Sequence, residues 1–154
     1  MSDDTRQTAN GDFLVIGYGN TLRSDDGVGA KVAAAVAELN LPGVTALVRH
    51  QLTPELAEPV SEARAVVFVD AAVDAAIEVQ VRQLEPAEGA QLMTHAADPR
   101  TLLALARQLF GRCPPAWWLN IPVENLEFGE ELSALARQGY ETALEKIRAL
   151  AIAH

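Results

Sequence analysis

The chain has 154 residues, of which 12 are Lys or Arg and 21 are Asp or Glu, so its formal net charge at pH 7 is −9. This length suits one domain with one core, because domains typically have about 100–150 residues. The apolar content of 49% argues against a disordered chain. The acidic balance argues against a nucleic-acid partner, since phosphate contacts need clustered Lys and Arg. No apolar stretch approaches the roughly 20 residues of a membrane helix, so we expect no membrane partner.

The cysteine content and the N-terminus bear on the compartment. Cys113 is the only cysteine, which excludes an internal disulfide and any metal site made of several cysteines. The first residues are polar and acidic, without the basic and apolar regions of a signal peptide. We therefore expect a cytoplasmic protein with a single domain over residues 1–154, comprising a flexible tail at 1–12 and a folded part at 13–150.

The first elements in chain order are a strand, a helix and a second strand. Residues 13–16 (FLVI) form an apolar run that ends in glycine, which predicts a buried strand and a tight turn. Apolar residues at helical spacing predict a helix over 27–39, with Asp25 as its N-cap and Asp26 in its first turn. Residues 44–48 are a second strand candidate.

The middle of the chain predicts a helix and two strands of different kinds. Thr53 and Pro54 open the helix, with threonine at the cap and proline at the first helical position. Residues 65–69 (AVVFV) are typical of a strand buried on both faces. The strand predicted at 79–84 follows after only nine residues, and a parallel return needs about a dozen or more, so we expect it to run antiparallel at a sheet edge.

The last third predicts two helices around a strand. One helix begins at Asp98 and Pro99 and is closed by Gly111, residues 116–121 form the strand, and a long helix runs from about Ser133. Strands thus alternate with helices, which predicts an α/β fold with helices on both faces of the sheet.

Candidate site residues gather where the predicted strands end. Ligands of open α/β sheets bind beyond the carboxyl ends of the strands. The first strand leads through a glycine loop to Asp26, the third leads directly into Asp70, and His95 lies in the loop before the third helix. These oxygen and nitrogen donors suit a divalent metal such as Ni²⁺, Zn²⁺ or Mn²⁺, with positions left for substrate or water.

Other interpretations of these residues stay open. Asp25 and Asp26 are typical helix caps, Asp70 suits a cap or an arginine partner, and His95 alone is an ordinary loop histidine. A dinucleotide-binding loop is disfavoured, because Leu22 replaces its third glycine and carboxylates at a helix N-terminus compete with a bound anion. A catalytic thiol and a serine nucleophile elbow are disfavoured too.

Several segments resemble the [NiFe]-hydrogenase maturation proteases. Residues 15–29 (VIGYGNTLRSDDGVG) look like the N-terminal signature of that family, and 67–71 (VFVDA) resemble its second acidic motif. Thr94 and His95 resemble its histidine motif, and 121–124 (IPVE) the stretch before its final helix. Residues 50–56 (HQLTPEL) look like a segment of one branch.

The resemblance implies a fold and an activity. The fold is a three-layer α/β/α sandwich around a mixed, mostly parallel five-stranded sheet with one antiparallel strand. The implied activity is that of an endopeptidase, which removes the C-terminal extension of a [NiFe]-hydrogenase large-subunit precursor after nickel insertion. The partner is that precursor, and we expect the protease to be a monomer.

The resemblance also assigns roles. Asp26, Asp70 and His95 are the expected catalytic and metal-contacting residues. Nickel is expected to be sensed in the substrate and not permanently bound, although other divalent metals can occupy the site. The expected substrate-binding residues are Gly19, Asn20 and Gln51.

Two further functions remain as alternatives at this point. One is a chaperone-like checkpoint that binds the nickel-loaded precursor without cleaving it, and the other is a metallohydrolase with its own metal. Within the protease hypothesis, either carboxylates or the metal activate water. Asp25 is expected to cap the helix and not to act as an acid.

Overall fold

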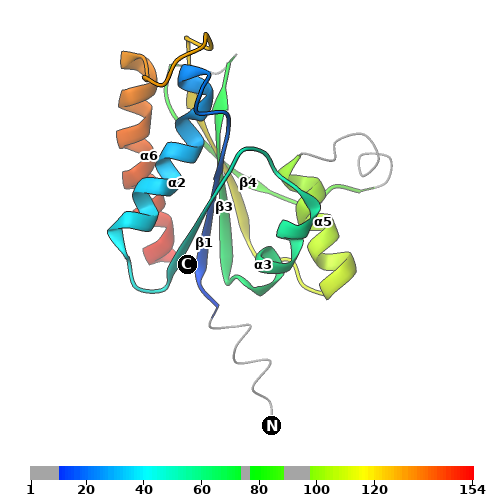
Figure 1. Cartoon of the computed structure of the whole chain (residues 1–154). Helices are drawn as coiled ribbons and strands as arrows, with labels where there is room; N and C mark the ends of the chain where they lie inside the picture. Colours follow the sequence, from blue (N-terminus) through cyan, green and yellow to red (C-terminus); the bar gives the residue numbers. More distant parts are fainter. Residues whose placement is uncertain (1–10, 74–76, 89–97) are drawn as a thin grey trace.

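The computed structural model describes residues 11–73, 77–88 and 98–154. The described residues form one five-stranded sheet in the order β2-β1-β3-β5-β4 (Figure 1). The strands are β1 (Phe13–Tyr18), β2 (Val44–Arg49), β3 (Ala65–Ala72), β4 (Gln80–Leu84) and β5 (Ala116–Pro122). The α-helices are α2 (Val28–Leu39), α3 (Ala57–Glu62), α5 (Pro99–Phe110) and α6 (Ala134–Ala153), and the short 3₁₀ helices are η1 (Ser24–Gly27) and η2 (Pro54–Leu56).

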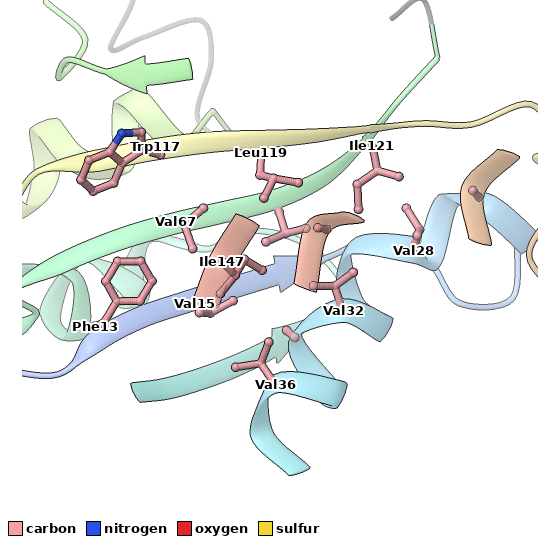
Figure 2. Close-up of a cluster of buried hydrophobic side chains, with 14 of the residues drawn as sticks. Phe13, Val15, Val28, Val32, Val36, Val67, Trp117, Leu119, Ile121 and Ile147 are labelled. Atoms are coloured by element: carbon pink, nitrogen blue, oxygen red, sulfur yellow. The ribbon is translucent and has the colours of Figure 1, made fainter. Parts of the chain in front are cut away.

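Helices cover both faces of the sheet, as the sequence predicts. Alternate residues of β1, β3 and β5 pack against α2 and α6 in the cluster drawn in Figure 2. The residues between them pack against α3 and α5 on the other face. Residues 65–69 of β3 are buried completely, which confirms the strand buried on both faces. None of the described helices is both long and apolar enough to cross a membrane.

The mixed sheet and its antiparallel strand are confirmed. β1 pairs in parallel with β2 and β3, and β3 pairs in parallel with β5. β4 is an edge strand and pairs antiparallel with β5, with Gln80 opposite Asn120 and Leu84 opposite Ala116. The short connection after β3 therefore leads to a strand that runs back beside β5.

The predicted caps differ in outcome. The Asp98 side chain accepts a hydrogen bond from Arg100 N at 2.8 Å, and Gly111 closes α5 with a φ of 77°, as expected. The N-cap assigned to Asp25 is wrong, because Asp25 lies inside η1 and the residue before α2 is Gly27. Thr53 occupies the cap position of η2, but its hydroxyl bonds the Glu55 carboxylate instead of a backbone N–H.

The last two residues of the predicted tail, Gly11 and Asp12, are hydrogen-bonded to Arg64 and Thr45. Residues 1–10 of the expected tail at 1–12 lie outside the described residues. Arg64 donates to the Gly11 carbonyl at 3.1 Å, and the Asp12 carbonyl accepts from Arg64 N at 3.0 Å. The Asp12 carboxylate also accepts from the Thr45 hydroxyl.

Glycines bring the start of α2 into direct contact with the carboxyl ends of the strands. A Cβ on Gly29 would lie 2.3 Å from the Val69 carbonyl oxygen and 2.8 Å from that of Tyr18. A Cβ on Gly17 would lie 2.0 Å from the Gly29 carbonyl oxygen. All three distances are too short for any side chain, so only glycine lets the helix approach this closely. The contact places η1, which precedes α2, next to the end of β3.

Candidate functional site

The structure brings two of the predicted site residues together. Asp70 lies near the carboxyl end of β3, and Asp26 lies in η1, immediately before α2. Both side chains are half-buried, and η1 packs against β3. Two carboxylates thus lie at the carboxyl edge of the sheet, which is where open α/β folds bind their ligands.

Burial makes Asp70 a weaker acid than an ordinary aspartate. It raises the pKa of Asp70 to about 6, and the nearby negative charge of Asp26 adds to the rise. Hydrogen bonds from the Tyr18 hydroxyl and from Ala71 N partly oppose it. A carboxyl group with this pKa exchanges its proton near neutral pH, which is a property that acid–base chemistry needs.

The Tyr18 hydroxyl contacts the Asp70 carboxylate, and Tyr18 packs in the same core cluster as Trp118. Burial, and then the charge of Asp70, raise the pKa of the Tyr18 hydroxyl, so this group stays a hydrogen-bond donor to the carboxylate. Trp118 pairs in register with Phe68, two residues before Asp70. The indole N–H itself has no hydrogen-bond partner of normal geometry among the described residues.

The glycine loop after β1 orients the Asp26 carboxylate. Its Oδ2 atom accepts a hydrogen bond from Asn20 N at 2.9 Å, while Asn20 Oδ1 accepts one from Leu22 N at 2.9 Å. Gly19 has a φ of 146°, and a Cβ there would lie 2.0 Å from the Asp26 carbonyl oxygen. Gly19 and Asn20, expected to bind substrate, therefore also shape the turn that carries Asp26.

Asp25 has a different role from its neighbour. Its side chain is fully buried, and its two carboxylate oxygens accept four hydrogen bonds. Oδ1 accepts from Ser133 N at 2.7 Å, and Oδ2 accepts from the Ser133 hydroxyl at 2.6 Å and from Glu124 N and Asn125 N at 3.0 Å each. Burial alone would raise the pKa of Asp25, but these hydrogen bonds outweigh it and lower the pKa. Asp25 is thus a buried anchor for the segment before α6, and it caps neither η1 nor α2.

Backbone hydrogen bonds reinforce this anchor. Asp25 N donates to the Asn125 carbonyl at 2.9 Å, and Ser24 N donates to that of Gly129 at 2.8 Å. Gly129 N in turn donates to the Leu22 carbonyl at 2.8 Å, and the Ser24 hydroxyl donates to that of Glu127 at 2.7 Å. The segment 124–133 is therefore fixed against the turn that carries Asp26.

Of the other residues considered from the sequence, Gln51 and Cys113 lie in the described part of the chain and His95 does not. His95 lies in 89–97, outside the described residues. Gln51 is exposed and follows β2, whose last residue, Arg49, accepts a hydrogen bond from Gly19 N at 3.2 Å through its carbonyl. This bond joins the chain that leads to Gln51 to the loop that orients Asp26. Cys113 is a free thiol between α5 and β5, at the other end of β5.

The donor set at this edge is compatible with a divalent cation but is incomplete in the described residues. No group of three or more His, Cys, Asp or Glu side chains in those residues is arranged to hold a metal. Asp26 and Asp70 supply carboxylate oxygens, which bind divalent cations. The described residues at this edge therefore supply two of the donors that such an ion needs.

Comparison with solved structures assigns the fold. The hydrogenase maturating endopeptidase HybD from E. coli superposes with a TM-score of 0.67 and 21% identity, over 90% of this chain and 91% of that one. The [NiFe] hydrogenase maturation protease HycI from Thermococcus kodakarensis KOD1 gives 0.68 and 23%, over 91% and 92%. An endopeptidase from Escherichia coli gives 0.70 and 22%, over 90% of each chain. The chain therefore has the fold of these proteins over nearly its whole length.

The sequence comparisons find no counterpart. No protein-family profile matches this chain, and no curated protein matches it either.

Asp25→Asn should destabilise the protein strongly. Asn has one carbonyl oxygen, so in either orientation its NH₂ group would face a backbone N–H of 124–133 that now donates to the carboxylate. Two buried donors that face each other without an acceptor, here the Asn NH₂ group and the backbone N–H, lower the free energy of unfolding by about 2–4 kcal/mol. Urea denaturation in the presence of a chelator measures the loss.

Asp26→Asn is the matched control for this substitution. It removes the same charge one residue away, but Asn can still accept the single hydrogen bond from Asn20 N. We expect a change within about 0.5 kcal/mol. Equal losses of stability in the two variants would contradict the role of Asp25 as the anchor.

Asp70→Asn should stabilise the protein increasingly as pH rises. The folded pKa of Asp70, about 6, lies above its ordinary value of 3.8. Its ionisation therefore costs stability as pH rises between these values, and the full cost is present above pH 6. The gain on substitution should grow by on the order of 1–2 kcal/mol between pH 4.5 and pH 7.5.

The measurement is urea denaturation of both proteins, free of metal, at the two pH values. Glu141→Gln serves as the control, because Glu141 is exposed and its substitution should give the same small change at both. A gain from Asp70→Asn that is independent of pH would show that Asp70 titrates normally.

Proposed function

We propose that this chain is an endopeptidase of the [NiFe]-hydrogenase maturation protease family and that it removes the C-terminal extension of a large-subunit precursor after nickel insertion. One observation carries the proposal: Asp26 and Asp70 lie together at the ligand-binding edge of a fold shared with hydrogenase maturation endopeptidases. The motifs around these residues also resemble that family. Asp26, Asp70 and His95 are the proposed catalytic residues.

Hydrolysis of a peptide bond needs a group that takes a proton from water and a group that gives one to the leaving nitrogen. Asp70, with a pKa of about 6, accepts the proton of the attacking water and later returns it to the amine of the released extension. Tyr18 holds the Asp70 carboxylate through its hydroxyl. Asp26, fixed by Asn20 N, supplies a second carboxylate to orient the water or the substrate.

Nickel enters this proposal as part of the substrate. The donors fit such an ion, because Asp26 and Asp70 offer carboxylate oxygens and His95 an imidazole nitrogen, which leaves positions for ligands from the precursor. Nickel bound there supplies a Lewis acid that polarises a carbonyl or lowers the pKa of water. An incomplete set in the protease suits recognition of an ion that the precursor already holds.

The same proposal assigns the remaining contacts. Gly19, Asn20 and Gln51 are the proposed substrate-binding residues, since the first two shape the turn around Asp26 and Gln51 follows the strand bonded to that turn. The proposed protease is a monomer that acts in the cytoplasm on the large-subunit precursor.

The test is incubation of the purified protein with a nickel-loaded large-subunit precursor, followed by the intact mass of the precursor. We expect the mass to fall by that of the extension. Asp26→Asn, Asp70→Asn and His95→Ala should each abolish cleavage without unfolding the protein, whereas Glu141→Gln should leave it unchanged.

Two outcomes would redirect the assignment. A stable complex with the precursor and no change of mass would identify a checkpoint that binds without cleaving. A stoichiometric metal in the protein purified without substrate would identify a metallohydrolase with its own ion. Wild-type rates of cleavage in one of the three variants would remove that residue from the site.

A further inference from the structure

Phe128 is an exposed aromatic side chain on the segment that Asp25 anchors. It is 87% exposed, the largest value for a large apolar side chain in the described part of the chain, and Leu22 is 49% exposed. The isolated parallel bridge between Arg23 and Gly129 joins the two loops, and Leu22 and Phe128 each precede one of the bridged residues. These two exposed apolar residues on adjoining loops are here called the Leu22–Phe128 patch.

Hydrogen bonds fix the backbone on both sides of this patch. Gly129 bonds Leu22 and Ser24, the Ser24 hydroxyl bonds the Glu127 carbonyl, and Arg23 Nε donates to the Leu126 carbonyl at 3.3 Å. These bonds fix the backbone on both sides of Phe128. Its exposure is a property of a fixed surface, which is how protein interfaces present aromatic anchors at low entropic cost.

The patch is joined to the candidate site. Asp26 Oδ2 accepts from Asn20 N, Asn20 Oδ1 accepts from Leu22 N, and the Leu22 carbonyl accepts from Gly129 N. Three consecutive hydrogen bonds thus lead from the Asp26 carboxylate to the residue after Phe128. The same pair of hydrogen-bonded loops therefore carries both the Asp26 carboxylate and the patch.

The charges around the patch define the kind of partner. Exposed carboxylates lie close to Phe128 in the sequence of the same segment: Glu124, Glu127, Glu130 and Glu131. They outnumber the two cations that bond this segment, where Arg23 Nε donates to the Leu126 carbonyl and Lys31 Nζ donates to the Glu130 carbonyl. A second copy of this chain would bring the same carboxylates against them, and each copy has a net charge of −9, so self-association through the patch is disfavoured. A partner with an apolar pocket bordered by Lys and Arg is complementary to it.

We propose that the Leu22–Phe128 patch is the docking surface for the folded body of the protein substrate, outside the extension that is cut. This inference rests on the proposed function. Phe128 anchors the body of the precursor, and the glutamates steer its basic surface, while Asp26 and Asp70 meet the peptide bond. Docking at a distance from the cut determines which protein is processed independently of the sequence at the cleavage point.

The test is the steady-state cleavage of the nickel-loaded precursor by Phe128→Ala and Leu22→Ala. Because Phe128 is 87% exposed, Phe128→Ala should leave the midpoint of thermal unfolding unchanged. We expect Phe128→Ala to raise KM about tenfold with little change in kcat, and 0.5 M NaCl to raise the wild-type KM as well. Ile152→Ala is the matched control, since Ile152 is 82% exposed near the C-terminus in α6 (Figure 1).

The outcomes separate this inference from the proposed function. Wild-type KM in Phe128→Ala, with cleavage intact, overturns the docking surface and leaves the protease assignment standing. If the wild type binds but does not cleave the precursor, the protease assignment fails, and Phe128→Ala must still weaken binding in calorimetry for the surface to hold. A wild-type dimer that Phe128→Ala converts to a monomer would assign the patch to self-association and overturn the inference.

Discussion

The site depends on the buried carboxylate of Asp25. Neutral N–H and O–H groups supply all of its hydrogen bonds. An aspartate removed from water without partners would be very costly, but the oxygens of Asp25 accept bonds from Ser133, Glu124 and Asn125. All of these donors lie on the segment between β5 and α6. The Asp25 side chain therefore joins the turn after β1 to the segment that precedes α6, at the carboxyl edge of the sheet.

The adjacent aspartates divide two tasks that their sequence alone does not distinguish. Asp25 is anchored inside the protein, which leaves Asp26 half-buried and directed by the glycine loop. The close contact of Gly29 with Val69 brings that turn to the end of β3. There burial, and to a smaller extent the charge of Asp26, raise the pKa of Asp70. Stability and chemistry thus depend on the same few residues.

Much of the fold could be predicted because its signals are local. The apolar runs predict the strands, the short connection after β3 predicts the antiparallel strand, and Asp98 with Gly111 marks the ends of α5. The anchor could not be predicted, since Asp25 bonds residues about 100 positions further along the chain and resembles a local helix cap. Asp26 and Asp70 could be placed at one edge from strand order, whereas the bond between Tyr18 and Asp70 required the register of β1 and β3. The place of His95 in the site stays a prediction.

The most direct measurement is the intact mass of the large-subunit precursor after incubation with the wild-type protein, compared between nickel-loaded and nickel-free precursor. If Asp26 and Asp70 act on a substrate that already holds nickel, only the nickel-loaded precursor loses the mass of its C-terminal extension. Equal cleavage of both forms would contradict the role assigned to nickel, and an unchanged mass in both would contradict the endopeptidase itself.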